Sequence, residues 1–477
     1  MLYFILAVAA LLAGYAVYGT FVAKVFGVDE NRPTPASRMA DGVDYVSMPV
    51  WKVYLVQLLN IAGLGPIFGP ILGALYGPAA LLWIVLGTIF AGAVHDFFSG
   101  MMSVRYNGLS IPDVVGKDLG NGFKQFMRAF SIVLLILVGV VFVLGPAKLM
   151  AVLTPESLDH VFWSVVIFGY YVLATMLPID KIIGRVYPIF AAVLLFMAVG
   201  LMVALVAQGY PVLPYDQFFT NLHPKALPLW PLMFITIACG AISGFHSTQS
   251  PLMARCLNSE KHGKFVFYGG MVGEGVIALI WATLGMSFYP DMAALQASIA
   301  AGSPSLVVKE VSMTLLGGFG GALAIIGVVI LPVTSGDTAF RGARLIVADF
   351  LGMPQKEIRK RLMISVPLFA VGLILCLVDF NVIWRYFAWS NQSLATVVLW
   401  SAGAYMIKRG KPHWIATLPA IFMTAMSITY IANAKIGLNL PMDISTWVGL
   451  AAAAAATIAF FSAFRPSRLA QMTPDEA

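Results

Sequence analysis

Long apolar runs separated by short polar stretches make up almost the whole chain. A helix needs about 20 predominantly apolar residues to cross the roughly 30 Å of hydrocarbon in a bilayer. Runs of this length predict thirteen membrane-spanning segments, near residues 2–24, 50–76, 78–104, 125–148, 160–178, 186–208, 230–254, 265–288, 314–340, 361–379, 383–407, 413–434 and 445–464. The longest connections are expected at 25–49, 105–124, 209–229, 289–313 and 341–360. None of them has room for a soluble domain, so the pattern predicts an all-α polytopic membrane protein.

The basic residues of the connections predict how the chain is oriented. With the N-terminus outside and the sides alternating, the outer connections hold only five basic residues, Lys148, Lys225, Lys309, Arg385 and Lys435. The other 24 of the 29 Lys and Arg residues then lie on the cytoplasmic side. The positive-inside rule requires such an excess of a correct topology. We therefore expect an outer N-terminus, a first span that is retained because it lacks the basic leader of a signal peptide, and a cytoplasmic C-terminus.

Two of the expected spans contain helix-breaking residues. The second holds Gly63–Pro70, with three glycines and two prolines, and the seventh holds Ile237–Pro251, with two glycines before its proline. Proline removes a backbone donor, and glycine lets the chain leave helical dihedral angles. Inside a bilayer, the freed backbone groups must be buried in protein or line a wet cavity. The pattern indicates two discontinuous helices; the alternative is a kinked but continuous helix, because Gly and Pro are common in membrane helices.

The two interruptions also predict how the chain is organised. They lie five spans apart, and an odd number of spans inverts the second copy, so spans 2–6 and 7–11 read as two inverted five-helix repeats. Corresponding broken helices in two such halves are typical of a transporter's binding site. The expected units are a first span and cytoplasmic loop (1–49), a first repeat (50–208), an outer loop (209–229), a second repeat (230–407), and two accessory spans with a short tail (408–477).

Composition agrees with this picture and narrows the partners. The chain is 60% hydrophobic and 11% charged, whereas soluble domains carry about 25% charged residues. The net charge of +7 therefore relates to topology and anionic lipid, not to nucleic acid. The three cysteines, Cys239, Cys256 and Cys376, lie in or beside apolar segments without metal or redox spacing, and we expect them to be buried and inert.

The interrupted spans supply the candidate substrate site. Their unwound backbone and helix N-termini carry partial positive charge, which suits a carboxylate. The many polar side chains after the glycines of span 7 require a polar cavity, whereas Asn and Gln of span 11 could instead serve as helix–helix glue. The candidate substrate-binding residues are Gly63, Gly65, Pro66, Phe68, Gly69, Gly240, Ser243, Gly244, His246, Ser247, Gln249, Asn391 and Gln392.

Ionisable residues within spans are candidates for coupling transport to an ion, because burying them is costly. His95 and Asp96 are adjacent, and since neighbours point about 100° apart on a helix they need not pair. His95 could relay protons or simply hold a neighbouring helix. Glu274 lies among glycines, where it could be loaded and unloaded with protons or could pair with Arg or His to fix packing.

Span 9 offers a second candidate for ion coupling. The hydroxyls of Thr334 and Ser335 would suit Na⁺, and Asp337 would suit H⁺. The alternative for Asp337 is a salt bridge with Arg341, four residues later on the helix.

Several of these motifs resemble the carbon starvation protein A family. They are Asp41-Gly-Val-Asp44-Tyr45, Ala62–Pro70, Gly92–Phe97, Glu274 in its glycine setting, Thr334–Arg341 and Ala388–Gln392. They extend over residues 41–410, although His95 stands where many long members carry Gln, and the chain resembles a short form of the family. The resemblance implies an inner-membrane transporter of the amino acid–polyamine–organocation superfamily, with a LeuT-like five-plus-five core, that takes up pyruvate or peptides with protons.

Together these observations predict a secondary active transporter, and not an enzyme, that imports a small organic anion or short peptide by H⁺ symport. A Na⁺-coupled solute or amino-acid symporter is the first alternative. An intramembrane enzyme using His95, Asp96 and Glu274 is the second, but no His-Glu-x-x-His or comparable metal spacing supports it. A channel lacks a repeated filter loop. No cofactor or metal is expected, and the expected partners are a small-molecule substrate and the lipid bilayer.

Overall fold

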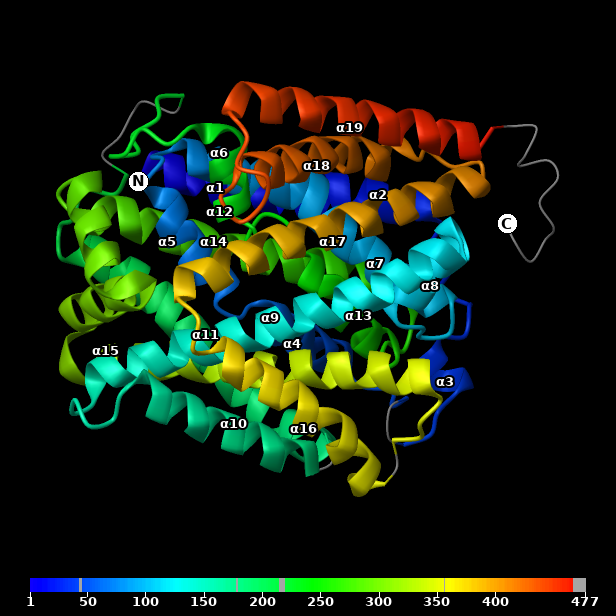
Figure 1. Ribbon diagram of the computed structural model, residues 1–477, viewed down its shortest axis with the longest axis horizontal. Coiled ribbons are helices and arrows are strands. Elements are labelled where there is room, and N and C mark those ends of the chain that lie inside the picture. Colours follow the sequence, from blue (N-terminus) through cyan, green and yellow to red (C-terminus); the bar gives the residue numbers. More distant parts are fainter. Residues whose placement is uncertain (43–44, 177–178, 214–218, 356, 466–477) are drawn as a thin grey trace.

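Every regular element in the described part of the chain is a helix (Figure 1). The computed structural model describes residues 1–42, 45–176, 179–213, 219–355 and 357–465, with the backbone alone at 179–189 and 191. The helices are α1 (Leu2–Ala13), α2 (Gly19–Phe26), α3 (Pro35–Arg38), α4 (Val50–Ile61), α5 (Gly65–Ala74), α6 (Ala79–Gly87), α7 (Ala93–Arg105), α8 (Ile111–Leu119), α9 (Asn121–Leu153), α10 (His160–Met176), α11 (Ile179–Ala207), α12 (Phe234–Thr236), α13 (Gly244–Ala254), α14 (Gly269–Phe288), α15 (Met292–Leu351), α16 (Ile358–Leu375), α17 (Phe380–Lys408), α18 (Trp414–Asn433) and α19 (Met442–Ala463).

The helices are long and apolar enough for a membrane protein. Seven helical segments in the described part could each cross a bilayer, and the bent pair α4–α5 would add an eighth. Most helices run along one axis, with the N-terminus at one end of the molecule and the end of α19 at the other (Figure 1). The α-amino group donates a hydrogen bond to the Val212 carbonyl, 2.8 Å away. The prediction of an all-α polytopic membrane protein is confirmed.

The helix breaks occur where the sequence predicts them. Helices α4 and α5 are bent by 51° about the residues between Ile61 and Gly65. Pro66 then lies in the first turn of α5, where its missing N–H costs nothing. In the second break the chain leaves helical geometry after Thr236 and resumes it at Gly244, and Gly240 takes the left-handed φ of +91° that glycine adopts readily. The continuous-helix alternative is therefore wrong for both spans.

Three connections contain more helix than expected, and one of them is 341–360, where α15 continues to Leu351 and α16 begins at Ile358. The other two are as follows. Residues 289–313, expected to be a connection, are helical from Met292 onward, and α15 has non-helical dihedral angles at Gly302, Ser303 and Gly317 that divide it into shorter pieces. Helix α8 lies in the expected connection 105–124 and buries Val114 and Val115. Both stretches carry too many polar residues for a span, but an amphipathic helix can bury one face at the end of a bundle.

The basic connections gather at the end of the molecule opposite the N-terminus. Arg105 pairs with Glu260 across two connections, Lys408 donates to the Lys117 carbonyl, and Lys411 donates to the Phe26 carbonyl. Residues far apart in sequence thus share one basic end, as the predicted topology requires. The orientation of that end relative to the membrane stays a prediction.

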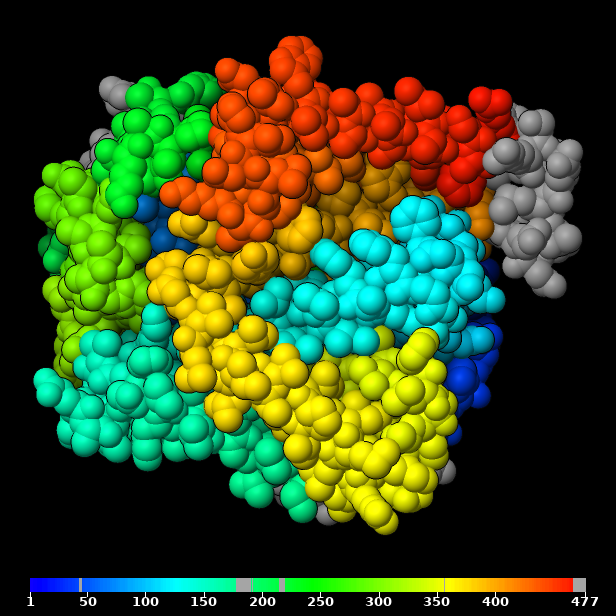
Figure 2. Space-filling view, in the orientation of Figure 1, coloured from blue at the N-terminus to red at the C-terminus, as the bar shows by residue number. Residues whose placement is uncertain are grey.

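Helix α17 occupies a central position in the bundle. Figure 2 shows it in gold between α18 and α19, in orange and red, and α9, in cyan. Its buried residues include Asn391 and Gln392. This position brings the amides of α17 against the second helix break.

Candidate functional site

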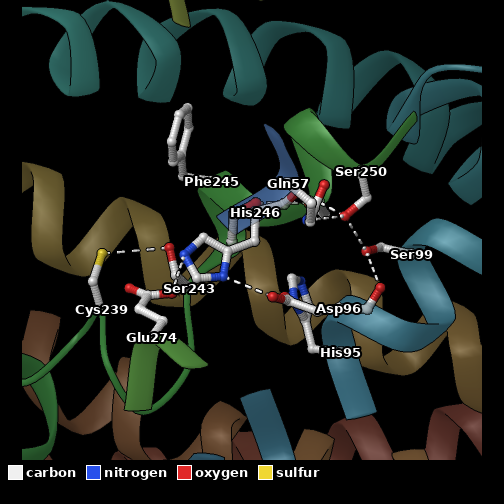
Figure 3. A network of polar contacts seen from close by, with 12 residues as sticks. Gln57, His95, Asp96, Ser99, Cys239, Ser243, Phe245, His246, Ser250 and Glu274 are labelled. Carbon is white, nitrogen blue, oxygen red and sulfur yellow. Dashed lines mark hydrogen bonds and ion pairs between the residues drawn. The ribbon is translucent and has the colours of Figure 1, made fainter. Parts of the chain in front are cut away.

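Four buried ionisable side chains form a continuous chain beside the helix breaks (Figure 3). His95 Nδ1 lies 2.8 Å from Asp96 Oδ1, and Asp96 Oδ2 lies 2.8 Å from His246 Nδ1. His246 Nε2 in turn lies 3.0 Å from Glu274 Oε2. All four side chains have no exposed surface. They come from three helices, α7, α13 and α14, so the chain exists only when these helices are packed together.

His95 and Asp96 contact each other although they are neighbours in sequence. The two carboxylate oxygens of Asp96 are divided between two imidazoles, one from His95 and one from His246. A bridging carboxylate can reach its own neighbour with one oxygen while the other crosses to the next helix. The sequence left open whether this pair interacts; the structure brings the two side chains together, with Asp96 at the centre of the ionisable chain.

The contact between His246 and Glu274 requires a proton. At 3.0 Å, the Nε2 lone pair and a carboxylate oxygen would repel each other if neither atom carried hydrogen. Either His246 is a cation between two carboxylates, or it is neutral and one of the two carboxyl groups, Asp96 or Glu274, is protonated. A second proton makes His246 a cation and Glu274 neutral at the same time. The net charge of this set of ionisable side chains therefore changes by one when a single proton is gained or lost.

Glu274 has spare capacity for such a proton. Neither of its carboxylate oxygens makes an aligned hydrogen bond within the described residues, and the same holds for Nε2 of His95. Buried polar groups normally have partners, so an unsatisfied group calls for a functional explanation. Both ends of the chain thus carry atoms that are free to exchange a proton.

Hydroxyl and amide side chains extend the polar network beyond His246. Ser250 Oγ donates to the His246 carbonyl and accepts hydrogen bonds from Ser99, at 3.2 Å, and Gln57, at 3.4 Å. Sequence reasoning did not select Gln57 or Ser99 (Figure 3). A signal for both was present, because Gln57 lies one turn before Asn60 and Ser99 one turn after His95.

Asn391 fixes the second helix break from α17. Its Oδ1 accepts the Phe245 N–H at 2.7 Å, and its Nδ2 donates to Ser243 Oγ at 3.0 Å. The backbone N–H groups at the start of α13 lack partners within their own helix, and Asn391 supplies one from another helix. Gln392 donates to the carbonyl of Phe234, at 2.7 Å, on the other side of the break. Both amides therefore act as glue between helices, which was the alternative for these residues.

Cys239 lies closer to the ionisable chain than its sequence spacing indicates. It is buried, as expected, but its Sγ and ligand atoms of His246 and Glu274 all lie within 4.8 Å of one another. A thiolate, an imidazole and a carboxylate at this spacing form a donor set that could hold a transition metal. The sequence shows no such spacing because Cys239 lies in the second helix break and Glu274 in α14.

The candidates of span 9 separate into two groups. Ser335 Oγ donates to the Leu59 carbonyl, at 3.1 Å, in the last turn of α4 before the break. Thr334 donates to the Leu331 carbonyl of its own helix. Asp337 forms the alternative salt bridge, with Arg341 Nη2 at 3.1 Å. Ser335 thus reaches the broken helix, whereas the carboxylate of Asp337 is engaged elsewhere.

The remaining candidates pack the two breaks against each other. A Cβ added at Gly65 would lie 2.1 Å from the Cβ of Cys239, and one at Gly69 would lie 3.1 Å from the Thr236 carbonyl. A Cβ added at Gly244 would lie 2.2 Å from the carbonyl oxygen of Asn391. The other members of the set, Gly63, Pro66, Phe68, Gly240, Ser247 and Gln249, are all buried. The glycines permit the close approach of the unwound segments on which the site depends.

Aromatic side chains close the breaks toward the N-terminal end of the molecule. The ring of Phe68 lies 6.1 Å from that of Trp384, which packs 5.3 Å from Phe387. Beyond Trp384 a cavity of about 560 Å³ is lined by Thr236, Ala388 and Tyr430, among others. At the other end, a pocket of only about 40 Å³ lies beside Thr248.

Comparisons with known proteins place the chain among transport proteins. The family model described as carbon starvation protein CstA matches residues 1–155, 147–314 and 292–430. A membrane protein of Haemophilus influenzae is 46% identical, over 64% of this chain and 96% of its own. The peptide transporter CstA of Bacillus subtilis is 29% identical, over 83% of this chain and 84% of its own. The pyruvate/proton symporter BtsT of Escherichia coli is 28% identical, over 57% of this chain and 47% of its own.

A solved structure shares the fold. Mhp1, a nucleobase–cation symport transporter in a closed conformation, superposes with a TM-score of 0.58, over 90% of this chain and 95% of that chain, at 13% identity. At this identity the likeness concerns the fold alone.

Proposed function

The chain belongs to the carbon starvation protein CstA family, and from this premise we propose that it imports a small, pyruvate-like organic anion or a short peptide together with protons. The named relatives are transporters of peptides and of pyruvate with protons, and they point to a transport protein and not to an enzyme. The shared fold with Mhp1 supports a secondary transporter.

The observation that carries the proposal is the buried chain from His95 through Asp96 and His246 to Glu274. With one proton held among Asp96, His246 and Glu274, this set of ionisable side chains bears one net negative charge. With a second proton it is neutral. An anion that binds at the helix breaks is repelled by the first state and tolerated by the second.

This arrangement couples the two solutes. If proton loading strengthens anion binding, anion binding must strengthen proton loading by the same factor. The unwound segments at Ala62–Leu64 and Ile237–Ser243 supply backbone donors, and the N-terminal end of α13 lies beside them, for the carboxylate of the substrate. The proposed substrate-binding and coupling residues are those named from the sequence, with Gln57 and Ser99 added, with Asp337 assigned to its salt bridge, and with Asn391 and Gln392 assigned to holding the second helix break.

The finer architecture is part of the proposal. We place thirteen spans in the inner membrane, with the N-terminal end of the molecule outside, and two inverted five-helix repeats at 50–208 and 230–407. The matched positions of the two helix breaks support the repeats. The unequal basic content of the two ends supports the orientation.

Uptake by purified protein in liposomes tests the function. A pH gradient, acid outside, is imposed without Na⁺, and accumulation of labelled pyruvate and of a labelled dipeptide is followed. We expect concentrative uptake of at least one of them, which a protonophore abolishes. Failure of both substrates to accumulate under any ion gradient would reject the proposal.

A Na⁺-coupled symporter is the second candidate, and one observation favours it. The Ser335 hydroxyl lies 3.1 Å from the Leu59 carbonyl beside the first break, and such oxygens are ligands for a hard cation. A Na⁺ gradient imposed at equal pH in the same liposomes decides between the two. Accumulation under Na⁺ alone, lost in Ser335→Ala, would support this candidate in place of proton coupling.

A further inference from the structure

The few basic residues of the N-terminal end converge on one cavity. A cavity of about 820 Å³ is lined by Lys148 at the end of α9, by Lys225, and by Arg385 near the start of α17. The cavity of about 560 Å³ beside the second helix break shares Leu75, Asn381 and Arg385 with it, and adds Lys435. The two cavities therefore meet at Arg385. We call the combined space the basic vestibule.

The vestibule is strongly unbalanced in charge. Its described lining holds four cations, Lys148, Lys225, Arg385 and Lys435, against a single carboxylate, Asp379. That carboxylate accepts the Asn381 N–H as the cap of α17, and its single negative charge leaves the four cations in excess. Among the described residues, no ion pair involves any of the four cations.

The neighbouring histidine does not offset or extend this charge. His223 lines the second cavity, and its Nδ1 accepts the Lys225 N–H. Burial, together with the charge of Lys225, lowers the pKa of His223 below its usual value, so its ring is neutral at pH 7. His223 therefore adds nothing to the charge of the four lysine and arginine side chains; the other histidine of the described lining, His160, lies in the first cavity.

This grouping runs against the general distribution of charge in the chain. Only five of the 29 basic residues belong to the outer connections, and four of these five line the vestibule. The fifth, Lys309, donates to the Val152 carbonyl and is not part of the lining. Anchoring to anionic lipid would place basic residues on the cytoplasmic side. A cluster of unpaired cations around a cavity instead provides charge for an anion.

We propose that the basic vestibule is an outer binding site for short carboxylate anions, which it collects before they pass the aromatic side chains to the helix breaks. The inference rests on the proposed transport function, and of its two substrate classes it favours small organic anions over zwitterionic peptides. Trp384, next to Arg385, lines the vestibule and packs against Phe68. The Lys148 ammonium lies 5.0 Å from the centroid of the Phe380 ring, which holds it at the cavity wall.

The charge of the vestibule can be measured without reference to transport. Asn381 lines both cavities, and the native cysteines are buried, so Asn381→Cys provides one reactive thiol. Its labelling rates with an anionic and a cationic methanethiosulfonate reagent are compared with those of Phe219→Cys, an exposed position outside the lining. We expect the anionic reagent to be favoured about tenfold more at position 381, since a charged cleft concentrates counter-ions by about 10-fold or more. Adding Arg385→Gln to Asn381→Cys should remove most of this preference for the anionic reagent.

Equal reagent preference at positions 381 and 219 would overturn the inference.

Transport then tests the role of the site. Arg385→Gln is expected to raise the KM for pyruvate about tenfold at low salt, with little change in maximal rate. The reason is that the anion binds in the vestibule before the proton-coupled step of transport. Arg385→Lys should retain a KM near that of the unmodified protein. Lys360→Gln removes the same charge at a position outside the lining, where Lys360 pairs with Glu357, and should leave the KM unchanged. An equal effect of Lys360→Gln and Arg385→Gln would also count against the site.

The two proposals fail separately. A protein that shows the labelling preference but accumulates no solute keeps the anion site and loses the transport function. A protein that accumulates pyruvate but shows no labelling preference at position 381 keeps the transport function and loses the vestibule. Melting temperatures of the variants, measured by thermal shift, show that the exposed substitutions leave the fold intact.

Discussion

Glu274 occupies the position in the site where a change of protonation alters the charge next to the helix breaks. Its side chain is fully buried, and the nearest ionisable partner is His246, 3.0 Å away. Glutamine has the same shape but cannot lose a proton. We expect Glu274→Gln to abolish uptake driven by a pH gradient while sparing exchange of labelled for unlabelled substrate. Parallel uptake and counterflow assays in proteoliposomes measure the two activities.

A matched carboxyl outside the site provides the control for this prediction. Glu310 accepts hydrogen bonds from Ser298 and Tyr289 and has no contact with the ionisable chain. Glu310→Gln should therefore keep gradient-driven uptake. Concentrative uptake by Glu274→Gln at the rate of the unmodified protein would remove Glu274 from the coupling mechanism.

Asp118 is a second buried carboxyl, but it lies in α8, outside the spans. Tyr106 donates a hydrogen bond to its Oδ1, at 3.0 Å, while its Oδ2 has no partner in the described part of the chain. Burial raises the pKa of Asp118 to about 7, against the opposing effect of Lys408 and Arg409. The folded protein therefore holds a proton that the unfolded chain, with an ordinary pKa of about 3.9, releases.

The raised pKa of Asp118 predicts the pH dependence of stability. Where the folded state binds more protons, stability falls as the pH rises. The contribution of Asp118 is thus fully present below about pH 4 and is lost as the pH rises to about 7. Asp118→Asn should raise the melting temperature by several degrees at pH 8 and leave it unchanged at pH 4, as measured by thermal shift. A destabilising effect at pH 8 would show that the buried carboxyl is instead held as an anion.

At the level of whole elements, the two helix breaks depend on each other. The Cβ of alanine at position 65 would lie 2.1 Å from the Cβ and 2.4 Å from the Sγ of Cys239. Overpacking of this kind costs about 1–3 kcal/mol. We expect Gly65→Ala to lower the melting temperature and to reduce transport, because the unwound segments can no longer meet.

A second substitution tests whether this contact is the cause. With glycine at position 239, the nearest remaining atom to the new Cβ would be the Cα of residue 239, at 3.6 Å, which is an ordinary contact. Gly65→Ala combined with Cys239→Gly should therefore recover part of the lost stability. Gly122→Ala, in open space on α9, serves as the neutral control. If the double variant were no more stable than Gly65→Ala alone, the contact would not explain the loss.

The elements differ in how far the sequence alone could predict them. The breaks at Ala62–Leu64 and Ile237–Ser243 follow from local chemistry, because proline and glycine change backbone geometry wherever they stand. The helical stretch before Gly317 was expected to be a connection because hydropathy detects spans and not short amphipathic helices. The sequence indicated each residue of the ionisable chain, but it could not indicate which of them contact one another. Asp96, His246 and Glu274 come from three helices, and no local pattern encodes how these helices pack.

At the scale of the whole molecule, the cavities described on the two sides of the helix breaks differ in size. Toward the N-terminal end the basic vestibule comprises cavities of about 820 and 560 Å³. Toward the basic end, the pocket beside Thr248 measures about 40 Å³. The sequence predicts which residues lie at which end through the distribution of Lys and Arg. It could not predict which end is open, because one sequence encodes every state of an alternating transporter.

This inequality predicts which side of the breaks a reagent reaches. Thr236 and Thr248 are both partly exposed and lie in the same interrupted span, one before and one after the break. Thr236 lines the vestibule, and Thr248 lines the small pocket. In purified protein without substrate, a bulky cationic thiol reagent should label Thr236→Cys at least about tenfold faster than Thr248→Cys, even though the basic vestibule disfavours a cation. A substrate with protons present should narrow the difference, because turnover populates states that are open to the other end. Faster labelling of Thr248→Cys before substrate is added would mean that the resting protein is open toward its basic end.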